Sequence, residues 1–378
     1  LGNKLGFTFV KPFAHIEGLF TLQPGGFLLE LAPGVEPEEI FQGVDYLNLG
    51  TLNNSECIDI NGIEIALTDV EDAYTKTLAD IFPAKSTNIT DMGNLDQGVY
   101  KETLPLTAFY NIAKPRVFIP VFPGINCEYD SALAFNNVGA QAETFVIRNL
   151  TAKAISESVD TMVKMINNAQ IIMLPGGFSA GDEPDGSGKF IATMFRNPKI
   201  KEAVTNLLDN RDGLILGICN GFQALIKLGL VPYGEILPMK DTSPTLTFNS
   251  IGRHVSQMVD TKIISNKSPW LALTEPGDIH TIAVSHGEGR FVATEEEIKA
   301  LFASGQVATQ YVDLAGNPTM ESPYNPNGSM YGIEGITSLD GRVLGKMAHT
   351  ERYSEGLMKN ITGNKEQPIF KAGVQYFK

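Results

Sequence analysis

The chain has 378 residues, of which 43% are hydrophobic and 19% charged, a balance typical of globular proteins and a length that suggests two domains. Its net charge of −14 argues against nucleic acids and anionic membranes as partners, because both need a basic surface. No apolar stretch approaches the roughly 20 residues that a membrane helix needs. The three cysteines, Cys57, Cys127 and Cys219, do not suggest a disulfide framework, so we expect a reducing, cytoplasmic setting.

Residues 1–85 predict a small α+β region. We expect a strand at 26–33, a short helix at 35–44 with Pro37 in its first turn, and a strand at 46–52. Asn61-Gly62 predicts a hairpin turn within 56–67. An amphipathic helix is expected over 69–82, with an apolar face formed by four residues: Val70, Ala73, Leu78 and Ile81. Residues 86–114 are polar and aperiodic, which indicates a linker that lies against a neighbouring surface.

From residue 115 to 378 the pattern changes to alternating strands and helices. Strands are expected at 117–122, 142–147, 170–175, 213–218 and 342–348; helices are expected at 129–139, 153–168, 198–210 and 220–230. Continuous apolar strands separated by helices predict an α/β fold, an open and mostly parallel sheet with helices on both faces. Ligands of such sheets bind at the carboxyl ends of the strands, so the functional loops should follow these strands.

The segment Gly217–Gln223 reads G-I-C-N-G-F-Q and lies between a predicted buried strand and a helix. Glycines two residues either side of Cys219 would allow the sharp turn of a nucleophile elbow. A helix N-terminus stabilises a thiolate, so we expect Cys219 to be a nucleophile rather than a buried structural cysteine. Cys127 also follows a strand but lacks the flanking glycines, and we expect no catalytic role for it.

A thiolate that attacks a carboxamide needs N–H donors for the oxyanion. The backbone N–H of Asn220 and the glycine-rich segment 175–182, with Gly177, could supply them. The nearby GSGKF at 186–190 lacks both the Ser/Thr and the upstream glycine of a P-loop. Gln223 lies one helical turn after Cys219, so we expect it to contact the substrate.

The base should be a histidine held by a carboxylate, and two His-x-Glu pairs compete for this role. His349 and Glu351 follow a clear terminal strand, whereas His286 and Glu288 lie in the glycine-rich segment SHGEGR, 285–290. The spacing favours His349 only modestly. The remaining histidines lack a comparable acidic neighbour and are expected to be surface or packing residues: His15, His254 and His280.

Seven stretches together resemble the class I glutamine amidotransferases, and more narrowly the glutaminase domains of phosphoribosylformylglycinamidine synthases. They lie within about 116–353 and read FPGINCE, LPGGFSAGD, LGICNGFQAL, IAVSHGEGR, YVDLAGNP, NPNGS with GITS, and GRVLGKMAHTER. The resemblance implies a flavodoxin-like fold and a triad of Cys219, His349 and Glu351. One departure is Thr350, where the family usually has proline.

The resemblance also extends to the first region, which is similar to the end of an ATP-dependent synthase domain. The chain starts LGNKLGFTFV without an initiator Met, so we expect a piece of a longer fused protein. ATP and Mg²⁺ would then bind mostly upstream of this chain, with no cofactor or metal in the glutaminase domain. The implied partners are glutamine and the upstream synthase domains of the same enzyme.

The expected function is therefore hydrolysis of glutamine through a γ-glutamyl thioester, supplying ammonia for purine biosynthesis. A non-catalytic scaffold and a cysteine peptidase on a related fold are the alternatives, and the intact Cys/His/Glu set and the LPGGFSAGD stretch argue against them. Ser285–Arg290 has no role in this triad, and we expect it to be a flexible loop that contacts the synthase.

Overall fold

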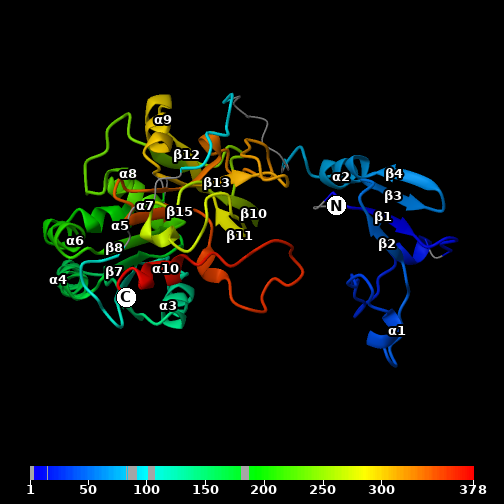
Figure 1. Ribbon diagram of the computed structural model, residues 1–378, viewed down its shortest axis with the longest axis horizontal. Coiled ribbons are helices and arrows are strands. Elements are labelled where there is room, and N and C mark those ends of the chain that lie inside the picture. Colours follow the sequence, from blue (N-terminus) through cyan, green and yellow to red (C-terminus); the bar gives the residue numbers. More distant parts are fainter. Residues whose placement is uncertain (1–3, 15, 82, 84–91, 101–106, 180–186) are drawn as a thin grey trace. The chain divides into compact units, whose positions relative to one another are not determined.

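The computed structural model describes residues 4–14, 16–81, 83, 92–100, 107–179 and 187–378 (Figure 1). The chain forms two compact units, Leu1–Ala84 and Lys85–Lys378. No helix among the described residues combines the length and hydrophobicity that crossing a bilayer requires.

The first unit contains a four-stranded sheet of order β2-β1-β3-β4. Its strands are β1 (Gly6–Phe9), β2 (Gly50–Asn53), β3 (Cys57–Ile60) and β4 (Ile63–Ala66), and its helices are η1 (Ile16–Phe20), α1 (Pro37–Ile40) and α2 (Leu67–Lys76). β3 and β4 pair antiparallel across Asn61-Gly62, whose φ angles of 54° and 91° suit a hairpin turn. The predicted hairpin and the short helix at Pro37 are confirmed.

Two predictions for this unit are wrong. Residues 26–33 form no strand, and Phe27 and Leu28 are exposed, because no neighbouring strand pairs with them. α2 begins at Leu67, earlier than predicted, and ends at Lys76. Leu78 and Ile81, assigned to its apolar face, therefore lie beyond the helix and are exposed. An apolar run alone does not tell which surface will cover it.

The second unit is built on a nine-stranded sheet of order β11-β10-β13-β14-β15-β8-β7-β5-β6. Five strands run parallel, as predicted: β5 (Arg116–Val121), β6 (Gln141–Val146), β7 (Ile171–Leu174), β8 (Leu214–Ile218) and β15 (Val343–Lys346). The other four extend the sheet antiparallel from β15: β10 (Val255–Ile263), β11 (Ile279–His286), β13 (Val307–Val312) and β14 (Ile333–Thr337). A second small sheet pairs β9 (Thr245–Phe248) with β12 (Glu288–Val292).

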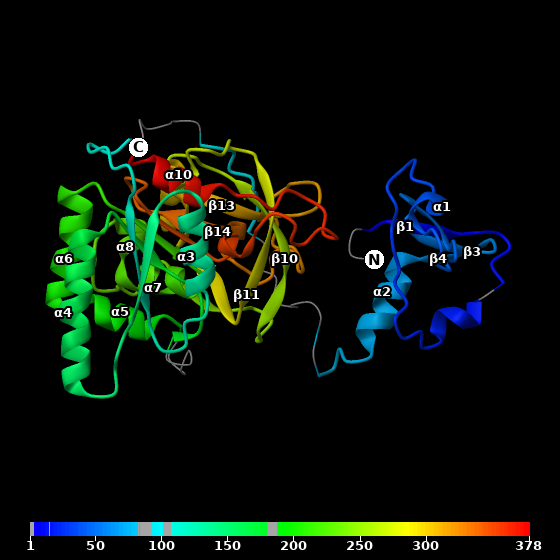
Figure 2. The same cartoon turned by 90° about the horizontal axis from the view of Figure 1, so that it is seen from below.

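Helices cover this sheet and complete the α/β fold. The α-helices are α3 (Glu128–Asn137), α4 (Ala152–Asn168), α5 (Lys189–Phe195), α6 (Pro198–Asn210), α7 (Asn220–Leu228), α8 (Leu230–Tyr233), α9 (Glu295–Ala303) and α10 (Ile369–Gln375). Short 3₁₀ turns among the described residues include η3 (Pro269–Leu271), η4 (Met330–Gly332) and η5 (Thr350–Arg352). α4 lies alongside α6, and α10 packs against α3 (Figure 2). The core is formed by the apolar strands β5, β7 and β8 and the helix faces that contact them.

The described parts of the expected linker belong to the second unit. The N–H of Ala108 donates to Tyr376 O at 2.9 Å, and that of Tyr100 donates to Ile264 O at 2.8 Å. Met92 and Leu95 pack on the core of this unit. Residues 84–91 and 101–106 lie outside the described residues, so the linker boundaries at 86 and 114 stay a prediction.

Candidate active site

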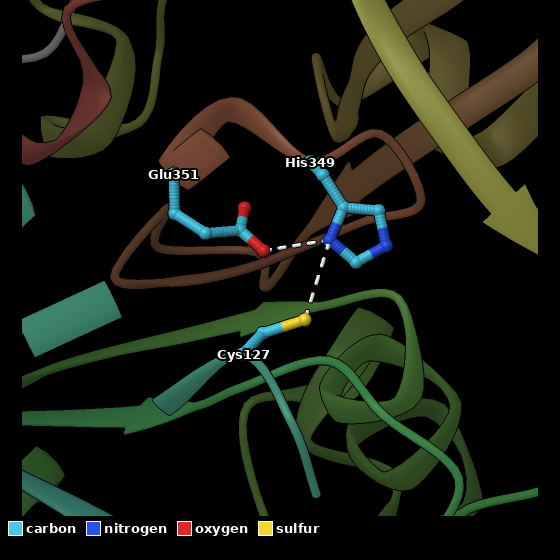
Figure 3. A group of neighbouring side chains, drawn as sticks. All are labelled: Cys127, His349 and Glu351. Carbon is cyan, nitrogen blue, oxygen red and sulfur yellow. Dashed lines mark hydrogen bonds and ion pairs between the residues drawn. The ribbon is translucent and has the colours of Figure 1, made fainter. Parts of the chain in front are cut away.

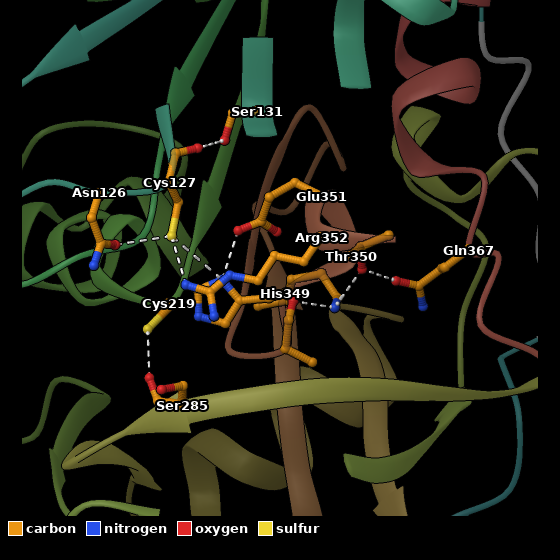
Figure 4. A network of polar contacts seen from close by, with 12 residues as sticks. Asn126, Cys127, Ser131, Cys219, Ser285, His349, Thr350, Glu351, Arg352 and Gln367 are labelled. Carbon is orange, nitrogen blue, oxygen red and sulfur yellow. Dashed lines mark hydrogen bonds and ion pairs between the residues drawn. The ribbon is translucent and has the colours of Figure 1, made fainter. Parts of the chain in front are cut away.

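The loops that follow β5, β7, β8 and β15 meet at the carboxyl edge of the sheet, as the strand pattern predicts. Figure 4 shows Cys127, Cys219 and His349, which follow β5, β8 and β15, gathered there. Gly176 lies at their meeting point. A Cβ placed there would be 2.6 Å from His349 Cε1, 3.2 Å from Cys127 Sγ and 3.4 Å from Cys219 Cβ. Position 176 must therefore be glycine, because any side chain would displace the groups that form the site.

Cys219 occupies a sharp turn between β8 and α7. Its φ of 52° and ψ of −106° are strained for a residue with a side chain. A Cβ at Gly217 would be 2.8 Å from Gly221 O, and one at Gly221 would be 1.9 Å from Leu174 O. Glycine is thus required on both sides, as in a nucleophile elbow. The sulfur lies at the N-terminus of α7, where the helix dipole stabilises negative charge.

His349 and Glu351 form a buried pair in the turn after β15 (Figure 3). His349 Nδ1 is 2.6 Å from Glu351 Oε1, and the His349 N–H donates to Ala283 O at 2.8 Å. Burial opposes charge on the imidazole, but the negative charges of Glu351 and Cys219 outweigh it and raise the pKa of His349 well above its usual value. With Nδ1 bound to Glu351, the ring's other nitrogen is the atom that can exchange a proton with a nucleophile.

Cys127 is also part of this site, which the sequence did not predict. Its Sγ is 3.9 Å from His349 Nδ1, 3.2 Å from Asn126 Oδ1 and 3.0 Å from Arg352 Nη2. Its backbone φ of −108° is relaxed, unlike that of Cys219, and the His349 atom that it approaches is already bound to Glu351. Cysteine spacing alone gave no signal for this contact, because it depends on how the β5 and β15 turns fold together.

Cys127, His349 and Glu351 could together hold a metal ion, since their ligand atoms all lie within 4.8 Å of one another. A thiolate, an imidazole and a carboxylate are ligands that Zn²⁺ accepts. The guanidinium of Arg352 beside the sulfur opposes a second cation there. The same set of atoms serves equally as a base, its orienting carboxylate and a neighbouring thiol.

The residues expected to bind the oxyanion flank Cys219. Gly177 has a φ of 147°, and a Cβ there would be 2.6 Å from Ile125 Cα, so only glycine fits. Asn220 begins α7 directly after Cys219, and its side-chain oxygen accepts from Ser179 N at 3.3 Å. Oxyanion binding by their N–H groups stays a prediction. Residues 180–182 of the glycine-rich segment lie outside the described residues.

Gln223 is buried on α7, and both ends of its amide have protein partners. Its Oε1 accepts from Asn220 Nδ2 at 2.9 Å, and its Nε2 donates to Glu288 O. These bonds tie the helix behind Cys219 to β12. Contact between Gln223 and bound glutamine stays a prediction.

The expectation that Ser285–Arg290 is a flexible loop is wrong, whereas its contact with the synthase stays a prediction. The segment spans the end of β11 and the start of β12, and His286 and Glu288 are buried. His286 Nδ1 contacts Asn249 Oδ1 at 3.1 Å, and Glu288 Oε2 accepts from Ser187 N at 2.9 Å. Burial, and secondarily the nearby His349 and His254, lower the pKa of His286 to about 3, which keeps it neutral. The glycines suggested a loop, but Gly289 lies within β12 and allows close packing, because a Cβ there would be 2.8 Å from the His286 ring.

The other histidines lie in varied surroundings. His254 Nε2 is 3.0 Å from Ser285 Oγ, and its ring lies against that of Phe178. His280 is buried in β11. These contacts agree with packing roles. His15 lies outside the described residues.

Comparison with known proteins agrees with this fold. A family model described as a CobB/CobQ-like glutamine amidotransferase domain matches residues 114–377. Phosphoribosylformylglycinamidine synthase subunit PurQ of Methanococcus maripaludis strain C7 is 36% identical over 247 residues, covering 63% of this chain and 82% of that protein. The PurQ subunit of Aquifex aeolicus strain VF5 is 32% identical over 243 residues, covering 64% and 93%.

Among solved structures, PurLQS from Thermotoga maritima aligns with a TM-score of 0.51 and 28% identity, covering 70% of this chain and all of that one. The second unit, with its α/β sheet and with cysteine, histidine and glutamate at the carboxyl edge, is therefore a glutamine amidotransferase domain. The chain belongs to the family of CobB/CobQ-like glutamine amidotransferase domains, and it is a PurQ-like member of that family.

Proposed function

We propose that the second unit hydrolyses glutamine to glutamate and ammonia, with Cys219 as nucleophile and His349, oriented by Glu351, as base. The observation that carries the proposal is the strained elbow of Cys219 beside the buried His349–Glu351 pair, whose Nδ1–Oε1 distance is 2.6 Å. Structure that surrounds a strained residue maintains it at a cost, which argues for a functional reason.

In the proposed reaction His349, whose raised pKa favours the protonated ring, already holds the Cys219 proton, and the thiolate attacks the side-chain carboxamide carbon of glutamine. The N–H groups of Gly177 and Asn220 bind the oxyanion that forms. His349 returns the proton to the leaving nitrogen, ammonia departs, and a γ-glutamyl thioester remains. Water, deprotonated by His349, then releases glutamate and restores the thiol. Two smaller barriers replace one large barrier.

The destination of the ammonia follows from the relatives. Proteins named phosphoribosylformylglycinamidine synthase subunit PurQ, and the PurLQS structure, support synthase subunits as the partners of this chain. We infer that the ammonia serves conversion of formylglycinamide ribonucleotide to the amidine, with ATP and Mg²⁺ bound in the synthase. The cysteines Cys57, Cys127 and Cys219 are all free, which agrees with the reducing cytoplasm expected for this reaction.

The test is alkylation of the full chain by a glutamine-mimicking electrophile, followed by peptide mass spectrometry. We expect label on Cys219 and loss of ammonia release in Cys219→Ala. Cys127 is the second candidate nucleophile, because its sulfur is 3.9 Å from His349 Nδ1. Label on Cys127 with Cys219 spared would transfer the nucleophile's role to Cys127. A chain that neither takes label nor releases ammonia would support the scaffold alternative, and cleavage of peptides would support a peptidase.

Two further expectations belong to this proposal. Gln223→Ala should raise KM more than it lowers kcat if its amide binds substrate, and an unchanged KM would remove that role. Glutaminase activity of this chain alone should be low compared with the same chain joined by its synthase partners, ATP and nucleotide substrate. Equal kcat/KM in both states would contradict the expectation that the synthase raises glutaminase activity.

A further inference from the structure

Lys346 is a buried cation directly beneath the turn that carries His349. Its Nζ is 2.7 Å from Ala348 O, 3.0 Å from Thr350 Oγ1 and 3.5 Å from Glu334 Oε1. The side chains of Lys346 and Glu334 are only 1% and 0% exposed. A buried ammonium is tolerated when its donors are used, and here all three oxygens lie within reach. Two of them belong to the residues on either side of His349.

The same turn is held at further points. The N–H of Ala348 donates to Glu334 Oε1 at 2.6 Å, and that of His349 donates to Ala283 O at 2.8 Å. Thr350 Oγ1 lies 2.8 Å from Gln367 Oε1 (Figure 4). Because Lys346 can only donate, the hydroxyl of Thr350 accepts from Lys346 and donates its single hydrogen to Gln367. The bonds thus form a directed chain from β15 through the turn to the segment before α10.

We propose that Lys346, Thr350 and Gln367 are positioning residues. They hold the His349 imidazole in the position and orientation that let it exchange a proton with Cys219. The inference rests on the proposed function, since it takes His349 as the base. Thr350 is the first residue of η5, a position where proline would fix φ without any hydrogen bond. Threonine leaves that dihedral freer, and the Lys346–Thr350–Gln367 chain supplies the restraint that a ring would otherwise give.

A purely structural role is the rival explanation. Glu334 also accepts from Thr309 Oγ1, so the Lys346–Glu334 pair could serve only to join β13, β14 and β15. A structural pair would alter the unfolding transition and leave turnover per folded molecule unchanged. A positioning role alters kcat, because small displacement of a base raises the barrier of the chemical step.

The experiment measures glutamate formation by the full chain and by Thr350→Val, Lys346→Met and the double variant Lys346→Met/Thr350→Pro. Thr350→Val removes the hydroxyl and keeps the shape and charge of the site. We expect it to lower kcat about tenfold with KM nearly unchanged, and Lys346→Met to lower kcat at least as much. The double variant should recover most of the loss, since proline restores the restraint and methionine leaves no unpaired ammonium.

Thr274→Val is the matched control, because it removes another buried hydroxyl. This hydroxyl donates to Leu271 O at 2.8 Å, and no bond links it to the turn that carries His349 among those described for that turn. It should leave kcat unchanged. Wild-type kcat in Thr350→Val, or a double variant no better than Lys346→Met, would overturn the inference. If Lys346→Met does not fold, Gln367→Leu takes its place, with the same expected loss of kcat.

Histidine NMR signals separate this inference from the proposed function. If the wild-type chain makes no glutamate and matches Cys219→Ala, the proposed function fails. The His349 imidazole signal still decides the positioning role: a shift or broadening in Thr350→Val, absent in Thr274→Val, supports it, and an unchanged signal refutes it.

Discussion

The two units of the chain differ in how far they bury their apolar side chains. In the first unit Phe20, Leu22 and Phe27 are at least 84% exposed, and the buried hydrophobic side chains among its described residues are those of Phe13 and Leu67. In the second unit the strands β5, β7 and β8 are almost entirely buried. The four short strands of the first unit therefore bury few apolar side chains, whereas the nine-stranded sheet and its helices enclose a large core.

The strained groups of the proposed site all lie in the well-packed unit. Cys219 keeps a φ of 52° because β8 and α7 are fixed on both sides of it. Gly176 allows side chains, and Gly221 allows the Leu174 backbone, to approach more closely than a Cβ would permit. A large buried core can maintain such strain, because the packed elements on both sides hold the backbone in place. The described residues of the proposed site therefore all lie in the unit with the large core, and the following predictions test this comparison.

The largest expected effect is loss of turnover on removal of His349. His349→Ala should lower kcat/KM by at least about 10³-fold, because no other group would take the Cys219 proton. Glu351→Ala should cost less, since Glu351 orients the ring. His286→Ala should retain measurable turnover. A dead His286→Ala with a near-normal His349→Ala, in the same ammonia assay, would mean that the wrong pair was assigned.

The next largest effect is the difference in stability cost between removing a buried ring in the second unit and an exposed ring in the first. Phe118→Ala in β5 removes a buried ring and should lower the free energy of unfolding by about 3–5 kcal/mol. Phe27→Ala removes an exposed ring and should change it by less than about 0.5 kcal/mol. Urea denaturation followed by circular dichroism measures both. A cost above 2 kcal/mol for Phe27→Ala would show that the first unit buries more than the structure indicates.

The sequence predicted the second unit better than the first for a physical reason. Apolar runs such as 117–122 and 213–218 become buried strands because neighbouring strands of the same chain cover them. The run at 26–33 is also largely apolar, but no strand among the described residues pairs with it, so its pattern was misleading. The antiparallel half of the sheet was missed because its pairing depends on contacts distant in sequence, such as β10 with β13.

The site shows the same limit. The elbow at Cys219 follows from local residues, namely glycines at a strand-to-helix junction. The choice between His349 and His286 did not follow from spacing and needed the family resemblance. The contact of Cys127 with Arg352, at 3.0 Å, and the bond from Gln223 to Glu288 O could not be predicted, since they join segments that lie far apart in the chain.

Acid should destabilise the second unit through His286. Burial lowers its pKa from 6.5 to about 3, so the folded chain binds this proton less readily than the unfolded chain does. The contribution of neutral His286 is fully present above pH 6.5 and is lost progressively as the pH falls toward 3. Between pH 7 and 5 the loss should be about 2 kcal/mol. Urea unfolding of wild type and His286→Gln at both pH values measures it, and equal losses in the two proteins would contradict the assignment.

The smallest effect concerns the first turns of two helices, one in each unit. Thr151 caps α4 by accepting from Ala154 N at 3.1 Å, whereas the equivalent residue of α2, Ala66, has no side-chain acceptor. Thr151→Ala should therefore cost about 1 kcal/mol of stability in the second unit. Ala66 already has the extended backbone of a cap residue, with φ −63° and ψ 139°, so Ala66→Ser should stabilise α2 by a similar amount.

Amide hydrogen exchange resolves these changes helix by helix. Ala66→Ser should slow exchange in the first turn of α2, and Ala66→Val, which adds bulk without an oxygen, should not. Because few side chains of α2 are buried, a new cap at position 66 should contribute a large part of the stability of this helix. The slower exchange should stay within α2. In Thr151→Ala the four buried side chains of α4 should limit faster exchange to its first turn. Faster exchange along the whole of α4 would mean that packing in the second unit is weaker than the comparison requires.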